Sequence, residues 1–256
     1  MRTSDDSLID YPPNAFNVGW TILAALGLAV IFFIVLVAGS IVFLAQHGFD
    51  QSVLRQATTS MFFVDVQGVA EVIIILYILA IMPSLSKLSL REIGFRSGTS
   101  RDWKIAGLGI VAMFVLITVV AGAFTTLLHF KTPEVAIAVY QHANSTDKVL
   151  FVLFGVILAP VFEEFVFRIF LFSMFRKWLG TAWAIGLSSF LFGIAHWQPP
   201  NVPAMYLSIT FPLMLGGAVL AYVYSRTGKA WASIVTHGAF NALTFLAVTL
   251  VPSLAK

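Results

Sequence analysis

The sequence of 256 residues contains no cysteine and little charge. The lack of cysteine excludes disulfide frameworks, thiol nucleophiles and thiolate metal sites. Charged residues make up 11% of the chain, against about 25% in an ordinary soluble domain. The net charge of +3 comes from scattered residues rather than a basic patch, so nucleic acid is not expected as a partner. Any chemistry must come from Ser, His, Asp, Glu, Asn, Arg or Tyr side chains.

Long apolar runs recur along the whole chain, and 59% of its residues are hydrophobic. A helix needs ~20 apolar residues to cross the hydrocarbon core of a membrane, and no run shows the sustained period of two that marks strands. The sequence predicts an all-α, polytopic integral membrane helical bundle of about seven transmembrane helices, with roughly six to eight as the range. The predicted spans are 18–44, 61–82, 105–128, 149–175, 181–196, 204–224 and 230–251. The second of them is expected to stop at Pro83.

Lys and Arg residues gather on one side of this predicted arrangement, which therefore sets its orientation. Ten of the fifteen basic residues fall in the N-terminal leader and in alternate loops. Cytoplasmic loops are enriched in Lys and Arg, so the N-terminus of this multi-pass protein is expected in the cytoplasm. We expect one membrane domain with three parts. They are a cytoplasmic leader at 1–17, N-terminal helices at 18–148 with an amphipathic connector at 83–104, and a C-terminal core at 149–256.

The fourth predicted span contains three ionisable residues, which are costly in hydrocarbon and therefore candidates for function. Glu164 and Arg168 are four residues apart, so they share a helix face and can neutralise each other. Glu163 points about 100° away from Glu164 and needs a partner from another span or from water. Pro160 loosens the backbone hydrogen bonding just before this pair. A purely structural Glu–Arg clamp is the alternative interpretation.

Two later spans add polar groups in pairs four residues apart. The fifth ends with Phe192 and His196, and the seventh contains His237 and Asn241. Convergence of a Glu, two His and an Asn in hydrocarbon is typical of a hydrolytic site, although hydrogen bonding between helices could also explain the last pair. Asp65 and Glu71 lie in the second span and are interpreted as structural, with Glu71 as a weaker candidate for the same cavity.

Two other functions fit the same polar residues. A proton-coupled membrane transporter would use Glu, Arg and His in its spans, but it would be expected to show paired broken helices in both halves. A catalytically silent immunity or scaffold protein of the same fold is the second alternative.

The polar residues form three motifs, which occur in the order known from one family. They are Glu163-Glu164-x-x-x-Arg168, Phe192-x-x-x-His196 and His237-x-x-x-Asn241. By these motifs the chain resembles the CPBP family, the CAAX-protease and bacteriocin-processing intramembrane proteases, also called the Abi family. The resemblance covers about residues 149–246, and the first three spans match only as generic membrane helices. It implies peptide-bond hydrolysis within the membrane, as in the endopeptidase that trims prenylated CAAX tails.

The resemblance also implies a role for each motif residue. Glu163 would activate water with help from His196, while His237 and Asn241 would stabilise the oxyanion. Glu164 and Arg168 would hold the fourth span in register, with Phe192 as a supporting residue of its motif.

The resemblance further implies a possible cofactor and the partners. The family is usually labelled metalloprotease, and Glu163, His196 and His237 could supply three zinc ligands with an open water position. A mechanism without metal would use the same residues, so the sequence leaves both open. The implied partners are membrane lipid and a membrane-associated or transmembrane peptide substrate.

Overall fold

The computed structural model describes residues 9–48, 61–128, 140, 143–196 and 204–251, and these residues form helices and turns with no strand among them. The helices that correspond to single predicted spans are α1 (Val18–His47), α3 (Met61–Ser86), α4 (Ser100–Leu128), α9 (Thr181–Ala195), α10 (Ala204–Thr227) and α11 (Ala230–Leu250). The fourth span is a composite helix made of α6 (Ser145–Leu153), η1 (Phe154–Leu158), α7 (Ala159–Glu164), η2 (Phe165–Phe172) and α8 (Ser173–Leu179). The expected all-α fold is confirmed.

Six of these helices are long and apolar enough to cross a membrane, and α9 is a shorter apolar helix. Their outer faces carry large exposed hydrophobic side chains, such as Trp20 on α1 and Leu108 on α4. Exposed apolar surface of this extent is stable only against lipid. Helices can lie in lipid because each one satisfies its own backbone hydrogen bonds. The chain is an integral, multi-pass membrane protein.

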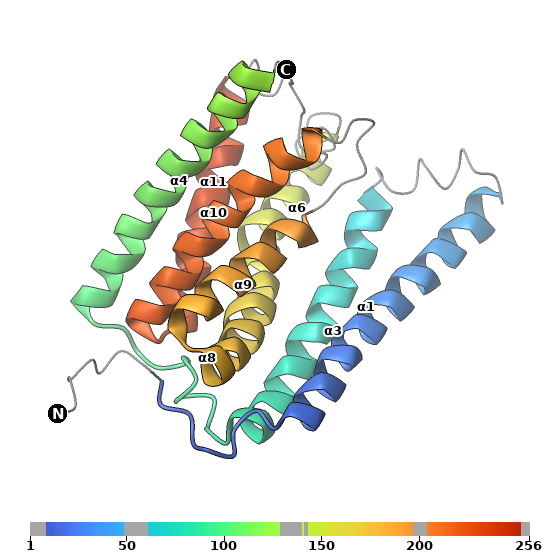
Figure 1. The fold of residues 1–256 in the computed structure, drawn as a ribbon. Helices are drawn as coiled ribbons and strands as arrows, with labels where there is room; N and C mark the ends of the chain where they lie inside the picture. The colour runs from blue at the N-terminus through green and yellow to red at the C-terminus, as the bar shows by residue number, and fades with distance from the viewer. Residues whose placement is uncertain (1–8, 49–60, 129–139, 141–142, 197–203, 252–256) are drawn as a thin grey trace.

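The helices form two groups that flank the composite helix and α9 (Figure 1). On one side α1 packs against α3, and on the other side α4 packs against α10 and α11. α3 also contacts the α7 and η2 parts of the composite helix, while α9 packs against η2, α8 and α10. The motif-bearing elements are therefore neighbours in the middle of the bundle.

The sequence predicted that the second span stops at Pro83, but α3 continues through this proline to Ser86. The missing N–H of proline costs one hydrogen bond, and the helix tolerates this loss in its last turn. The Ser86 hydroxyl then donates to the carbonyl of Met82 at 2.7 Å and closes the helix end. The connector that was expected to start at residue 83 therefore starts four residues later and leads into α4 at Ser100.

Residues 9–17 of the leader fold against the ends of α3 and α8. Phe16 is 1% exposed, and its backbone N–H donates to the carbonyl of Leu85 at 2.7 Å. The Trp178 indole donates to the carbonyl of Phe16 at 3.0 Å. The Tyr11 hydroxyl donates to the Ser173 hydroxyl at 2.6 Å. These contacts fix the start of α1 and the end of α8 together.

The composite helix changes its hydrogen-bonding pattern on both sides of α7. In η1 and η2 the bonds run from residue i to i−5, so that the N–H of Ala159 donates to the carbonyl of Phe154. Pro160 has no N–H, so the next carbonyl in this pattern, that of Gly155, lacks its helical partner. π-Helical turns of this kind occur mostly at functional sites. Here four residues separate the end of η1 from the two glutamates, and η2 starts directly after them.

Candidate active site

Three side chains from three different elements meet around Glu163. The Oε1 atom of Glu163, on α7, lies 3.6 Å from Nε2 of His196, which caps the end of α9. The Oε2 atom lies 3.7 Å from Nε2 of His237, on α11. These distances are too long for direct hydrogen bonds but short enough for strong electrostatic interaction. The side chains are 16%, 25% and 5% exposed respectively, so the cluster is mostly enclosed but not sealed.

The other ring nitrogen of each histidine is held by an acceptor, and this fixes how the imidazoles face Glu163. Nδ1 of His196 lies 2.8 Å from the carbonyl oxygen of Phe192, one turn back in α9. Nδ1 of His237 lies 3.2 Å from Oε1 of Glu164. A carbonyl and a carboxylate only accept, so both Nδ1 atoms carry the proton, and both Nε2 atoms are turned toward Glu163.

Glu164 is buried completely and bridges two elements. Its Oε2 lies 3.0 Å from Nε of Arg168, at 0% exposure for both side chains, and its Oε1 receives His237. The spacing of four residues predicted the pairing with Arg168, but not the contact with His237. Spacing within one helix identifies partners on that helix, whereas the contact with His237 depends on how α11 packs against α7.

Phe192 lies between the cation and the two histidines of the site. The Arg168 guanidinium lies over the Phe192 ring at 5.1 Å from its centroid, which is the geometry of a cation–π interaction. The same ring is 5.8 Å from the His237 ring and packs against His196 at 4.7 Å. The Nη1 and Nη2 atoms of Arg168 have no hydrogen-bond acceptor among the described residues, so this aromatic face is an important part of their surroundings.

Asn241 contacts the backbone of the composite helix. Its Nδ2 donates to the carbonyl of Gly155 at 2.7 Å, and this is the carbonyl that Pro160 leaves without a helical partner. The amide has a second N–H available for another acceptor. The structure thus brings Glu163, His196 and His237 together and places Asn241 one turn along α11 from His237, against η1.

Two glycines allow the motif helices to approach closely. A Cβ atom on Gly238 would lie 2.5 Å from the carbonyl oxygen of Val156 in η1, and a Cβ on Gly193 would lie 2.8 Å from the carbonyl oxygen of Thr210 in α10. Gly238 follows His237 directly, and Gly193 precedes His196 by one turn. Neither glycine was predicted from the sequence, although a small residue close to each motif histidine indicates close helix packing.

The donor types of the site suit zinc, but their arrangement does not. Two ligands of one tetrahedral zinc are about 3.4 Å apart, since each lies at 2.0–2.1 Å from the metal. Both carboxylate–imidazole distances of Glu163 exceed this value. Among the described residues, no group of three or more His, Asp or Glu side chains is placed to hold a metal ion. The geometry gives the zinc prediction no support, and it stays a prediction.

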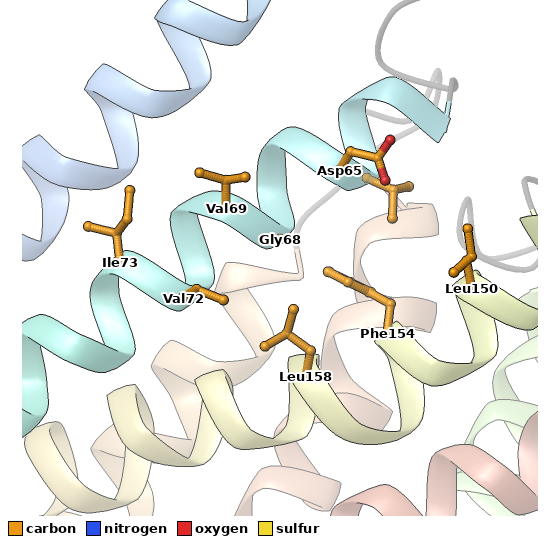
Figure 2. Close-up of a pocket in the computed structure, with 9 residues that line it drawn as sticks. Asp65, Gly68, Val69, Val72, Ile73, Leu150, Phe154 and Leu158 are labelled. Atoms are coloured by element: carbon orange, nitrogen blue, oxygen red, sulfur yellow. The ribbon is translucent and has the colours of Figure 1, made fainter.

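A groove of about 450 Å³ runs between α3 and the composite helix, outside the cluster. Leu150, Phe154 and Leu158 point across it toward α3, and Asp65 stands near one end (Figure 2). Leu158 lies five residues before Glu163, so the groove ends about one helical turn from the cluster. Asp65, interpreted from the sequence as structural, is exposed on this wall.

Residues 144–243, which contain all three motifs, match the family model described as type II CAAX prenyl endopeptidase Rce1-like. Over these residues the chain is similar to the Rce1-like family. This match confirms the resemblance found from the motifs.

Two further comparisons concern the whole chain. A curated relative from Lactococcus lactis subsp. cremoris, described as "UPF0177 protein in abiGi 5'region", is 31% identical over 166 residues. The aligned part covers 62% of this chain and 66% of the relative, just under two thirds of that protein. No solved structure matches.

Proposed function

We propose that this chain is an intramembrane endopeptidase that hydrolyses peptide bonds of membrane-associated or transmembrane substrates. The observation that carries the proposal is the approach of two imidazole Nε2 atoms to the carboxylate of Glu163 inside an apolar bundle. A carboxylate flanked by two histidines is suited to take a proton from water and pass it on. The match of residues 144–243 to the Rce1-like family model supports this chemistry.

Charge balance assigns the protonation of the cluster. Glu163 and Glu164 bring two negative charges and Arg168 brings one positive charge, so a neutral site needs one more proton. His237 lies between both carboxylates, at 3.2 Å and 3.7 Å, and is the better place for it. As an imidazolium, His237 donates Nδ1–H to Glu164 and has an Nε2–H for a developing oxyanion. His196 then stays neutral, with Nε2 as an acceptor.

The proposed reaction then proceeds in two steps, addition of water and collapse of the tetrahedral intermediate. Glu163 accepts a proton from water while the water oxygen bonds to the carbonyl carbon of the scissile peptide. The oxyanion receives hydrogen bonds from Nε2–H of His237 and from the second amide N–H of Asn241. The tetrahedral intermediate collapses as the C–N bond breaks, and Glu163 returns the proton to the leaving amine. His196 accepts a hydrogen bond from the attacking water and orients it.

The test is cleavage of a transmembrane peptide library by purified protein in vesicles. Glu163→Gln should abolish cleavage, since an amide cannot accept the proton, and should leave the thermal unfolding temperature nearly unchanged. Glu92→Gln, the same change at an exposed loop carboxylate, is the control and should cleave normally. Full activity of Glu163→Gln would contradict the proposal, and an inactive wild-type chain would favour the silent alternative.

A chelator arm tests the zinc prediction separately. If the residues act alone, prolonged chelation leaves cleavage unchanged. Loss of cleavage on chelation, with recovery on addition of zinc alone, would show that the side chains close around a metal ion in the active protein.

A further inference from the structure

The hydroxyl group of Tyr11, in the N-terminal leader, contacts the composite helix at the end of η2. Tyr11 is buried, and its hydroxyl donates to the Ser173 hydroxyl at 2.6 Å. Ser173 is buried completely and directly follows the last residue of η2. The Ser173 hydroxyl donates in turn to the backbone carbonyl of Arg168 at 3.3 Å. Two consecutive hydrogen bonds therefore connect the leader to a residue of the candidate active site.

The direction of both hydrogen bonds follows from the groups that form them. The carbonyl of Arg168 only accepts, so the one proton of the Ser173 hydroxyl points to it and the Ser173 oxygen accepts from Tyr11. Burial raises the pKa of the Tyr11 phenol above its ordinary value, so this hydroxyl keeps its proton at neutral pH. The relay thus runs from Tyr11 through Ser173 to Arg168.

The π-helical segment η2 ends at Ser173. A π-helical pattern is rare and mostly limited to a single turn, whereas η2 contains eight residues, so contacts with its surroundings are needed to hold it. Ser173 supplies two of them, because its backbone N–H donates to the carbonyl of Phe170 and its hydroxyl donates to that of Arg168. Serine hydroxyls that bond back to a helical carbonyl change the local helix geometry. Ser173 therefore helps to fix the hydrogen-bonding pattern of η2.

The Arg168 side chain links η2 to the polar residues of the site. Its Nε lies 3.0 Å from Oε2 of Glu164, and Oε1 of Glu164 lies 3.2 Å from Nδ1 of His237. Glu164 is the last residue before η2 begins, so the first turn of η2 separates it from Arg168. A π-helical turn contains more residues than an α-helical turn. A change of η2 to the α-helical pattern would therefore turn Arg168 relative to Glu164.

We propose that Tyr11 is a positioning residue of the protease site, which acts through Ser173 to hold η2 in the π-helical form that directs Arg168 to Glu164. The proposal rests on the proposed function. Tyr11 belongs to the leader rather than to the motif helices, so it affects kcat rather than KM. The docked leader is then a part of the active protein as well as an anchor for α1.

Removal of the two hydroxyl groups, one at a time and together, tests the relay. Tyr11→Phe keeps the ring, which packs against Phe16 at 5.2 Å and lies 5.9 Å from the Arg176 guanidinium. It should lower kcat roughly fivefold at unchanged KM, and Ser173→Ala should lower kcat at least as much. Because both changes break the same relay, the double variant should lose no more kcat than Ser173→Ala alone.

The matched control is Tyr222→Phe, which removes the same hydroxyl group from a tyrosine that is 54% exposed on α10. It should behave as wild type. Full kcat in Tyr11→Phe, a change confined to KM, an equal loss in Tyr222→Phe, or losses that multiply in the double variant would each overturn the proposal.

Hydrogen–deuterium exchange tests the relay without relying on proteolysis. The backbone amides of residues 165–172 should exchange several-fold faster in Tyr11→Phe and in Ser173→Ala than in wild type, while those of α4 keep their wild-type rates. Unchanged exchange in η2, or an equal rise in α4, would overturn the proposal even if cleavage fell. An inactive wild-type chain in which η2 responds as expected would contradict only the proposed function.

Discussion

Glu163 and Glu164 are adjacent in the chain but face different partners. Glu164 is closed off between Arg168 and His237, whereas Glu163 is partly exposed and faces two imidazoles without a direct hydrogen bond. The 100° turn per residue of a helix accounts for this division. In the proposed function, Glu164 therefore has a structural and electrostatic role, and Glu163 takes part in the chemistry.

At the residue scale, the first prediction concerns Arg168. Arg168→Ala would leave Glu164 buried with only His237 as a partner, and loss of one partner of a buried ion pair costs ~3–5 kcal/mol. We expect a large drop in thermal stability in detergent, against little change for Glu163→Gln. Equal losses of stability in the two variants would contradict the division of roles between the glutamates.

A second prediction at this scale concerns the orientation of His237. Glu164→Gln keeps the size of the side chain but replaces the carboxylate that holds Nδ1 of His237. In the proposed mechanism this carboxylate also balances the charge of the His237 imidazolium. Removing such an orienting partner typically lowers activity by about 10–100-fold. Steady-state kinetics should show this loss in kcat rather than in KM. Unchanged kcat in a folded Glu164→Gln protein would show that His237 does not need the carboxylate.

At the scale of elements, the composite helix and α11 fit together through a defect in backbone hydrogen bonding. Pro160 leaves the Gly155 carbonyl without its partner, Asn241 supplies one, and Gly238 lets α11 come close enough for this contact. The same approach brings His237, one turn away on α11, to Glu163 and Glu164. The proline, the π-helical turn and the glycine thus act together.

The hydrogen bond of Asn241 can be tested by a double-mutant cycle with Pro160. Asn241→Leu alone leaves a buried carbonyl unsatisfied and should destabilise the fold by ~1–3 kcal/mol. Pro160→Ala restores an N–H that can bond to Gly155, so the cost of Asn241→Leu should become smaller in that background. Strictly additive changes in the free energy of unfolding would show that the two residues do not share this carbonyl.

Helix approach can be tested by adding one methyl group at Gly238. Gly238→Ala would place Cβ 2.5 Å from a backbone oxygen of η1 and force the helices apart, at a cost of ~1–3 kcal/mol and with loss of cleavage. Gly122→Ala is the control, because a Cβ there meets nothing within 4 Å. Its stability should equal or slightly exceed that of wild type. Equal tolerance of both substitutions would contradict close packing at Gly238.

At the scale of the whole molecule, the helices alternate in direction, so the loop before α4 and the start of α6 lie at opposite ends of the bundle (Figure 1). The basic residues predict that the first of these ends faces the cytoplasm. The chain has no native cysteine, so single cysteines report on each end without interference.

The predicted orientation can be tested by replacing each of two exposed serines with cysteine and labelling it. Ser97→Cys, in the loop before α4, should react only with reagent on the cytoplasmic side, and Ser145→Cys, at the start of α6, only with reagent on the outer side. Both are small surface changes at polar positions, so each protein should remain folded and active. The reverse pattern of labelling would overturn the predicted cytoplasmic N-terminus.

The helical character and the spans were determined largely by the sequence itself. Apolar runs of membrane length must form helices because lipid offers the backbone no other hydrogen-bond partners. Spacing of four residues paired Glu164 with Arg168, since one helix carries both and its geometry is fixed. The predicted end of α3 was wrong. Proline by itself favours the end of a helix, but three further residues continue α3 beyond Pro83.

Contacts between helices were decided only by the tertiary structure. The link from Glu164 to His237, the approach of both histidines to Glu163 and the hydrogen bond of Asn241 to Gly155 all join residues more than thirty positions apart. Such distances depend on which faces of the helices pack and how closely, and small residues such as Gly238 set that approach. The types of residue therefore predicted the chemistry of the site, whereas helix packing determined which atoms meet.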